Sequence, residues 1–452
     1  MVCAGTVGKG AALGAAYLGL STNTTTDLRP ILTSAYQAGN LSNANPSTNV
    51  ELSYGNEIDA MVNVALAMNY PSVLLEEIDA VSHVVCTDSS VSVTFDSDAL
   101  FKFCTSAWNL DDKEGLVIIT NHMGNCDVEH ERGIFYATST TWDAKSLTVT
   151  ARTEKKEVAD VAASTEISFA NVPLAHRKRK ITFDKSGIRI SNNVSLPAST
   201  QLFSVPRYVS LTADEAFVGA EVTFSGKLKF NILRAKLEQL TFDIDASMAA
   251  QLGLTLNVEG PYTNSLRYAP GELSYQLVNI PGILKFGPAL EFAIGMDVDA
   301  DAKLSATTDL ALAMPAANVH LDAVNGKNNQ ATGWTPKFTA QANITQKAQV
   351  GLNPWVELTL EMAVELFGGA LDLSTGVTAK PKMTNQFDFN AGQTVGTGGV
   401  GQNNDGNPRT CDTGLAIRSD FDFSLIAFVT QFWKSTVYST HVPVANECYT
   451  WL

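Results

Sequence analysis

The chain has 452 residues, of which 45% are hydrophobic and 17% charged, and its formal net charge is −15. This balance excludes a disordered, collagen-like or coiled-coil protein. An acidic surface repels phosphate backbones and therefore argues against a nucleic-acid partner. At roughly 100 to 200 residues per domain, the length predicts two or three domains.

Two interpretations of residues 1–20 stay open. An apolar run of small residues from Ala11 to Leu20 follows Lys9, as in the core of a cleaved signal peptide. The same residues are also typical of a plain glycine-alanine tail. No apolar run in the chain reaches the length that a membrane-spanning helix needs, so no transmembrane segment is predicted. Residues 21–50 are rich in Thr, Asn and Ser, which is typical of a linker.

Residues 51–170 are expected to form a small α+β module. Apolar residues alternate in segments 62–68 and 91–95, which predicts half-buried strands. Ser97 and Asp98 offer helix caps, so a helix is expected over residues 99–108. Further strands are predicted at 116–119, 134–136, 147–151 and 167–169.

A basic cluster, residues 176–180, lies in the next segment, 171–215, which we interpret as a linker. The simplest interpretation of the cluster is a solvated group of charges. A second is a processing site, where a secretory protease would cut after the pair Lys178 and Arg179 in an exposed loop. A nuclear-localisation signal is the third, and it conflicts with the secretory features below.

Residues 216–452 show apolar side chains at every second position over unusually long segments. From Leu240 to Val258 every even position is small or apolar, and at about 3.3 Å per residue such a strand would be roughly 60 Å long. The pattern recurs in segments 222–232, 290–314, 338–366, 371–383 and 415–425. An apolar face of this size must be covered. We therefore predict a mainly β protein, in which an elongated antiparallel β-sandwich or flattened barrel follows the α+β module.

Four Asn-x-Ser/Thr sequons are consistent with a secreted glycoprotein. The candidate glycosylation sites are Asn23, Asn40, Asn193 and Asn343.

Several short motifs suggest a family. In the first module they are Tyr70–Glu76, Val84–Cys86, Ser106–Trp108, Ile118–His122 and Cys126–Tyr136; in the second, Phe224–Leu228, Ile280–Ile283, Gly333–Pro336 and Cys448. Through them the chain resembles a group of secreted fungal proteins of unknown function that carry two modules, and the resemblance covers about residues 51 to 450. It implies an extracellular or cell-wall setting and no known enzymatic role. The chain departs from that group in lacking a cysteine just before residue 217.

In an oxidising compartment the cysteines would pair as Cys86 with Cys126 and Cys411 with Cys448, since each pair lies within one module. Loop entropy would make each bridge worth about 4 kcal/mol. Cys104 and Cys3 are left over.

Two groups of residues have some features of metal sites. His122, Cys126 and His130, with Glu129, could supply zinc ligands, although we favour a structural loop. Asp297, Asp299, Asp301, Asp243 and Asp245 could bind calcium across strands, although a solvated face is the simpler interpretation. We predict no metal and no cofactor.

No group of residues has the pattern of a catalytic site, so no catalytic residue is nominated and we expect no enzyme. The leading hypothesis is a secreted structural or adhesive protein of the fungal surface, whose partners are cell-wall or matrix components or further copies of itself. The alternative is an extracellular protein that binds lipid or another hydrophobic ligand. A glycan-active enzyme ranks third.

Overall fold

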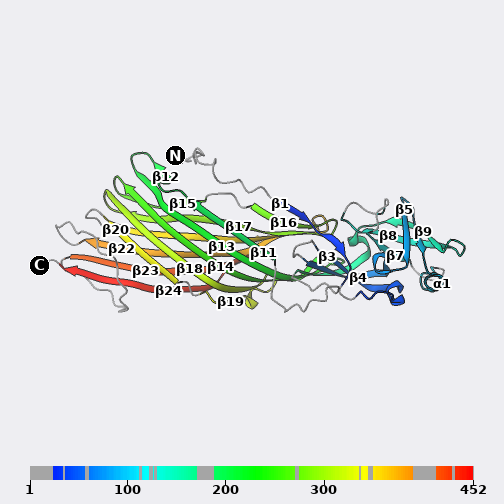
Figure 1. Cartoon of the computed structure of the whole chain (residues 1–452). Coiled ribbons are helices and arrows are strands. Elements are labelled where there is room, and N and C mark those ends of the chain that lie inside the picture. The colour runs from blue at the N-terminus through cyan, green and yellow to red at the C-terminus, as the bar shows by residue number, and fades with distance from the viewer. Residues whose placement is uncertain are drawn as a thin grey trace, which may run out of the picture.

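Long β-strands make up most of the computed structural model and give it an elongated shape (Figure 1). The structure describes residues 24–33, 36–55, 61–110, 115–121, 126, 130–169, 188–269, 274–334, 337–344, 350–389, 414–429 and 433–450. A group of shorter strands with helix α1 forms one end of the molecule. None of the helices in these ranges is long and apolar enough to cross a membrane.

The described residues of the N-terminal part form ten strands, two α-helices and two 3-10 helices. Its elements are β1 (Thr24–Asp27), β2 (Arg29–Ile31), η1 (Leu41–Ala44), β3 (Ser47–Gly55), β4 (Met61–Leu74), η2 (Leu75–Glu77), β5 (Val81–Thr87), β6 (Ser90–Phe95), α1 (Asp98–Ala107), β7 (Leu116–Thr120), β8 (Gly133–Asp143), β9 (Thr148–Lys155), α2 (Val158–Val161) and β10 (Ala162–Phe169).

The C-terminal part is described as strands with one further 3-10 helix. Its elements are β11 (Ile188–Leu196), β12 (Thr200–Val205), β13 (Val209–Asn231), β14 (Lys236–Val258), β15 (Tyr262–Tyr268), β16 (Ser274–Ile280), β17 (Leu284–Ala300), β18 (Leu304–Asp322), η3 (Gly326–Asn328), β19 (Gln330–Thr332), β20 (Lys337–Ile344), β21 (Val350–Leu366), β22 (Leu371–Phe389), β23 (Gly414–Val429) and β24 (Trp433–Thr450).

The strands form two sheets, which we call sheet A and sheet B. Sheet A has the order β1-β16-β17-β21-β22-β23-β24, and β15 pairs with β17. Sheet B has the order β19-β18-β14-β13-β10-β4-β7-β8-β9-β6-β5, and β2, β3, β11, β12 and β20 join it beside this path. The long neighbours β13 and β14 pair in antiparallel register along nearly their whole length.

The apolar faces of the two sheets pack on each other. Ile244 and Leu254 on β14 are 1% and 0% exposed. Phe169 of sheet B lies 4.9 Å, between ring centroids, from Phe286 of sheet A. Trp334, which follows β19, stacks at 5.6 Å on Phe423 of β23. The apolar side chains at every second position of the long strands thus form a core that the two sheets share.

A second apolar core fills the N-terminal end, where α1 packs against short strands. The helix begins at the cap that the sequence predicts, because the Ser97 side chain accepts a hydrogen bond from the Leu100 amide at 3.3 Å. Trp108 closes the other end of the helix and donates its indole N–H to the Ala44 carbonyl at 2.8 Å. This core is separate from the one between the long sheets.

The N-terminal part and the long sandwich share both sheets. Strand β10 pairs with β13 over residues 164–169, and β1 pairs in parallel with β16. Leu28, between β1 and β2, is fully buried in the core of the sandwich. Hydrogen bonds and apolar contacts therefore cross between the two modules.

The predicted fold class is confirmed: the protein is mainly β and forms two sheets. The described strands form two separate sheets, so the second module is a sandwich and not a flattened barrel. Strands also form in the segments interpreted as linkers: β1, β2 and part of β3 lie within 21–50, and β11, β12 and part of β13 lie within 171–215. These strands escaped prediction because Asn, Ser and Thr, which are typical of loops, occupy exposed strand positions there.

Candidate functional site

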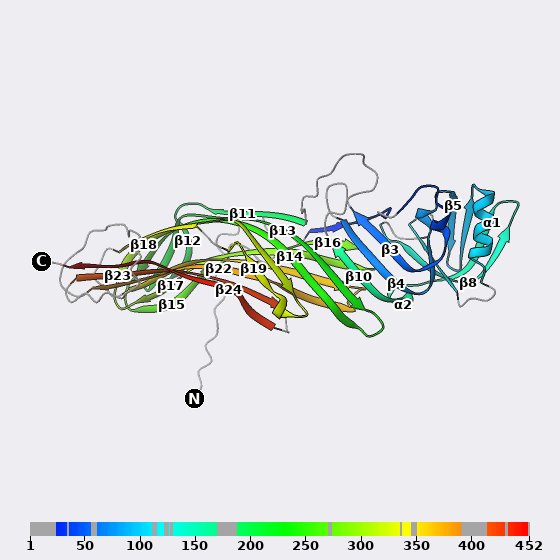
Figure 2. The same cartoon turned by 90° about the horizontal axis from the view of Figure 1, so that it is seen from below.

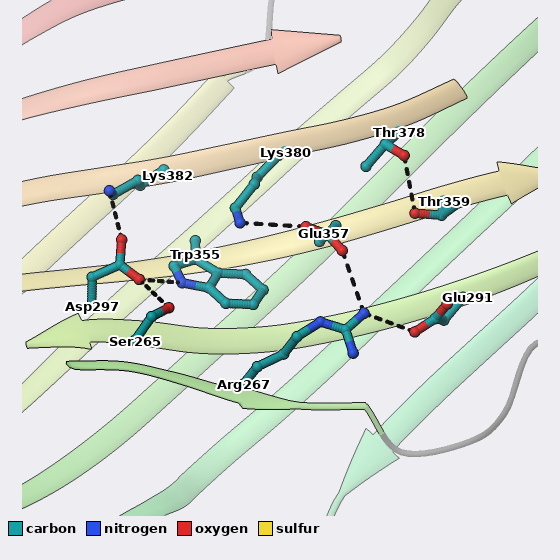
Figure 3. Close-up of polar contacts among 10 residues, drawn as sticks. All are labelled: Ser265, Arg267, Glu291, Asp297, Trp355, Glu357, Thr359, Thr378, Lys380 and Lys382. Atoms are coloured by element: carbon teal, nitrogen blue, oxygen red, sulfur yellow. Dashed lines mark hydrogen bonds and ion pairs between the residues drawn. The ribbon is translucent and has the colours of Figure 1, made fainter. Parts of the chain in front are cut away.

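A polar network lies on the outer face of sheet A (Figure 3). Its centre is Trp355 of β21, which belongs to the polar face of the strand and is nevertheless only 2% exposed. Its indole N–H donates to Asp297 Oδ1 at 3.0 Å, and the Lys380 ammonium lies 3.9 Å from the ring centroid. Gly295 faces Trp355 across β17 and β21, and any Cβ there would collide with the indole ring. Trp355 is therefore fixed by contacts with Asp297, Lys380 and Gly295.

Asp297 is the acceptor that three strands share. Its carboxylate pairs with the Lys382 ammonium at 2.6 Å and accepts a hydrogen bond from Ser265 Oγ at 2.6 Å, in addition to that from Trp355 (Figure 3). Burial acts to raise the pKa of Asp297, but Lys382 and these hydrogen bonds outweigh it and hold the pKa below its usual value. The carboxylate is thus ionised and accepts from three neighbouring strands.

Arg267 extends the network toward β15. Its guanidinium reaches Glu291 at 2.8 Å and Glu357 at 3.4 Å, and Lys380 pairs with Glu357 at 3.3 Å (Figure 3). Each such half-exposed ion pair contributes about 0 to 1 kcal/mol. The network therefore links β15, β17, β21 and β22, which lie side by side in sheet A.

The outer face of sheet B differs, because it is hollowed. One hollow of about 450 Å³ is lined by Glu221, Asp245, Asn318 and their neighbours. A second, of about 440 Å³, adjoins it and begins at Asn193 and Phe217. The two share Glu221, Ser247 and Pro315, so together they form one trough across the strands.

A β-bulge contributes to this trough. Two residues of β18, Pro315 and Ala316, stand opposite the single residue Ser247 of β14. Proline cannot donate a hydrogen bond to the ladder, and a bulge accommodates it. The residues at the bulge, Ser247, Pro315 and Ala316, all have short side chains and line the trough.

A buried ion pair ties the N-terminal segment to the first module. Arg132 and Glu76, whose side chains are 1% and 7% exposed, meet at 2.5 Å between Nε and Oε1. Arg132 also donates to the carbonyls of Ile31 and Ser53, each at 3.2 Å, and lies 4.4 Å above the Tyr54 ring. The Arg132 guanidinium therefore joins three other segments of the chain, β2, β3 and η2.

The structure joins one of the two cysteine pairs that the sequence analysis proposes, Cys86 with Cys126. Cys104 is a buried free cysteine, and burial raises the pKa of its thiol to about 12. Cys3 and Cys411 lie outside the described residues, so the pairing of Cys411 with Cys448 stays a prediction.

The candidate modification sites are spread over the molecule. Asn193 is exposed on β11, Asn40 caps η1 by accepting a hydrogen bond from the Ser42 amide, and Asn343 lies on β20. Asn23 and the pair Lys178 and Arg179 lie outside the described residues.

Most of the candidate metal ligands that the structure describes have other partners. Cys126 is oxidised in the disulfide and is not available as a thiolate, while His122 and Glu129 lie outside the described residues. The aspartates of the polar faces bind neighbouring side chains: Asp299 accepts from Thr263, Asp243 from His320 and Asp245 from Asn318. Within the described ranges no group of three or more His, Cys, Asp or Glu side chains could hold a metal ion.

Sequence reasoning missed the Trp355 network, the trough and the Arg132 pair. A tryptophan at an odd position of a strand with apolar even positions is a signal for the first. The trough has no comparable signal, because its small residues come together only through the register of four strands. No sequence signal marks Arg132 either.

Comparison with known proteins finds two domains of unknown function. Residues 65–166 match the family model of DUF7029, and residues 238–450 match that of DUF7223. No curated protein and no solved structure matches the chain. The chain therefore fits a two-module protein of unknown function.

Proposed function

We propose that this chain is a secreted structural or adhesive protein of the fungal surface that acts by binding and without catalysis. Its long sandwich serves as a rigid spacer that carries the N-terminal module at one end. Its partners are cell-wall or matrix components.

The observation that carries this proposal is the continuous core between two sheets of very long strands. Strands β13 and β14 each have 23 residues, which corresponds to about 75 Å at 3.3 Å per residue. The inward residues are buried along this length, and the Trp355 network braces the outer face of sheet A. A two-layer body of this kind resists bending, since any bend would open the packed interface.

The disulfide between Cys86 and Cys126 supports an oxidising compartment, because such bonds form and persist outside the cytosol. The resemblance to secreted fungal proteins supports the same setting. The alternative, a protein that binds lipid or another hydrophobic ligand, requires space along the apolar face. Ile244, Leu254 and Met296 are fully buried there, which favours a structural role.

The proposal is tested by expressing the chain in a filamentous fungus with a C-terminal tag and separating medium, cell wall and cytosol. We expect the chain in the medium or wall fraction, with Cys86 and Cys126 oxidised, and binding to purified wall fragments in a sedimentation assay. A variant that lacks residues 1–20 tests whether these residues direct secretion, in which case it stays in the cytosol. Recovery of the natural chain only from the cytosol would contradict the proposal. Stoichiometric lipid in native mass spectrometry would support the alternative.

A further inference from the structure

A sequon asparagine stands at one end of the trough on sheet B. Asn193 and Ser195 are exposed on β11, while Val194 between them packs against the core. Successive strand residues point to opposite faces, so Asn193 and Ser195 share the outer face. Among the described strands β11 pairs with β13 alone, which leaves its other side accessible to a large modification.

The strand register continues from Asn193 into a row of very small residues. Asn193 pairs with Gly219, Gly219 with Ala249, and Ala249 with Ala313. Neighbouring strands lie about 4.8 Å apart, so this row runs about 14 Å across four strands. We call these four residues the floor row. It forms a track at right angles to the strands that begins at the asparagine side chain.

Gly219 has a specific reason to lack a side chain. A Cβ at this position would lie 2.6 Å from Asn193 Oδ1 and 2.9 Å from the Phe217 ring. The glycine thus makes room for the asparagine side chain above it. The half-buried ring of Phe217 lies over Gly219 beside the asparagine and lines this part of the trough, where an aromatic surface can contact the apolar face of a sugar ring.

The opposite side of the floor row is polar. Glu221 and Ser247 come next along β13 and β14, and Asp245 with Asn318 lies beyond them. Asn318 Nδ2 donates to Asp245 Oδ1 at 2.9 Å, and an ionised carboxylate has further acceptor sites for hydroxyl groups. The two hollows have volumes of about 440 and 450 Å³, within the usual range of sites for small molecules of roughly 300 to 1,000 Å³.

We infer that Asn193 carries an N-linked glycan whose first sugars lie in this trough. The glycan covers the exposed residues of the floor row, Ala249 and Ala313, contacts Phe217 on one side and binds the polar groups near Glu221 on the other. This inference rests on the proposed function, because only a chain that enters the secretory pathway is glycosylated. To the proposed function it adds the attachment site, Asn193, the chemistry of the ligand and the face of the protein that the sugar covers.

The test uses the full chain secreted from a yeast host, with glycopeptide mass spectrometry to map the occupied sequons. We expect glycan on Asn193 and its loss in Asn193→Gln. The folded protein is then treated with an endoglycosidase that cuts between the first two sugars. If the glycan is docked about nine-tenths of the time, release from Asn193 is about tenfold slower in the folded chain than after unfolding.

A blocking variant separates docking from mere attachment. Ala249→Phe fills the middle of the floor row and is expected to restore release to nearly the unfolded rate while Asn193 stays occupied. Thr241→Phe, on the outer face of the same strand and outside the trough, is the matched control and should keep the slow rate.

The outcomes distinguish this inference from the proposed function. The inference is overturned if the secreted protein carries no glycan on Asn193. It is also overturned if the glycan is released equally fast from the folded and the unfolded chain. Either result leaves the proposed function standing. Slow release that Ala249→Phe does not change overturns docking in the trough. Recovery of the natural chain only from the cytosol of its fungal host overturns the proposed function, and the inference with it.

Discussion

Replacing Ile244 with aspartate probes the packed interface between the sheets. Ile244 lies on the inward face of β14, opposite Phe224 on β13 and Val319 on β18. Loss of the buried isoleucine lowers the free energy of unfolding by about 1.5 to 3 kcal/mol. An unpaired buried polar group lowers it by about 1 to 3 kcal/mol more, and a charged group costs at least the upper value of that range. A total of about 4 kcal/mol is a large part of a net stability of about 5 to 15 kcal/mol. Leu254→Asp should behave in the same way.

The assay is urea unfolding followed by tryptophan fluorescence, with the yield of secreted protein as a second measurement. Thr241→Asp is the matched control. It adds the same charge to the outer face of β14, between Lys227 on β13 and Asp322 on β18, whose opposite effects on the new carboxylate offset each other, and it should change the free energy of unfolding by less than about 0.5 kcal/mol. Burial raises the pKa of the new carboxyl at residue 244 above about 3.9. The destabilisation therefore grows as the pH rises above that value.

Two results would refute this reasoning. If Ile244→Asp and Leu254→Asp both unfold at the wild-type urea concentration, the even positions of β14 do not form a packed interface. If they keep wild-type folding and secretion but lose a bound hydrophobic ligand, the apolar face lines a groove and the lipid-binding alternative is correct.

Three further predictions concern other contacts. Cys86→Ser opens a bridge between residues 40 apart and should lower the free energy of unfolding by about 4 kcal/mol; a urea midpoint equal to that of the oxidised wild type would contradict it. The pKa of Asp297 is held below its ordinary value, so its contribution is present above about pH 4 and is lost as the pH falls. Asp297→Asn should therefore lose less stability than wild type between pH 7 and pH 3 in chemical denaturation, and equal losses would refute this. Arg132→Met should cost about 3 to 5 kcal/mol, and Glu76→Leu in the same chain should restore part of it; thermal melting that shows no effect of the single change would argue against a structural role for the pair.

The long strands could be predicted from sequence because each carries one unbroken apolar face, and burial of that face dominates the energetics. The helix 98–107 was found for a similar reason, since Ser97 supplies a side-chain cap and an apolar stripe follows. Strand β24 was missed because Val437, Tyr438 and Val442 are interleaved with polar residues on a sheet edge. An edge strand buries less apolar surface than a central strand, so its sequence needs fewer alternating apolar residues.

The surface features could not be predicted, because they depend on register. The trough requires Gly219, Ala249 and Ala313 to lie side by side, and shifting either pairing by one residue would move one of them to the inner face. Asp297 appeared in sequence as one of several aspartates on a wet face. Only the pairing of β17 with β21 places Asp297 beside Trp355, and this contact distinguishes it from an ordinary solvated carboxylate.

Small-angle X-ray scattering of the full chain purified from culture medium tests the rigid-spacer claim most directly. We predict one elongated particle with a two-sheet cross-section, about 10 Å between sheet centres, and a longest dimension of at least about 75 Å, the length of one 23-residue strand. We also predict that the profile does not change between low and moderate salt, because the modules share hydrogen-bonded sheets. A compact particle, or two bodies whose separation varies, would contradict the account.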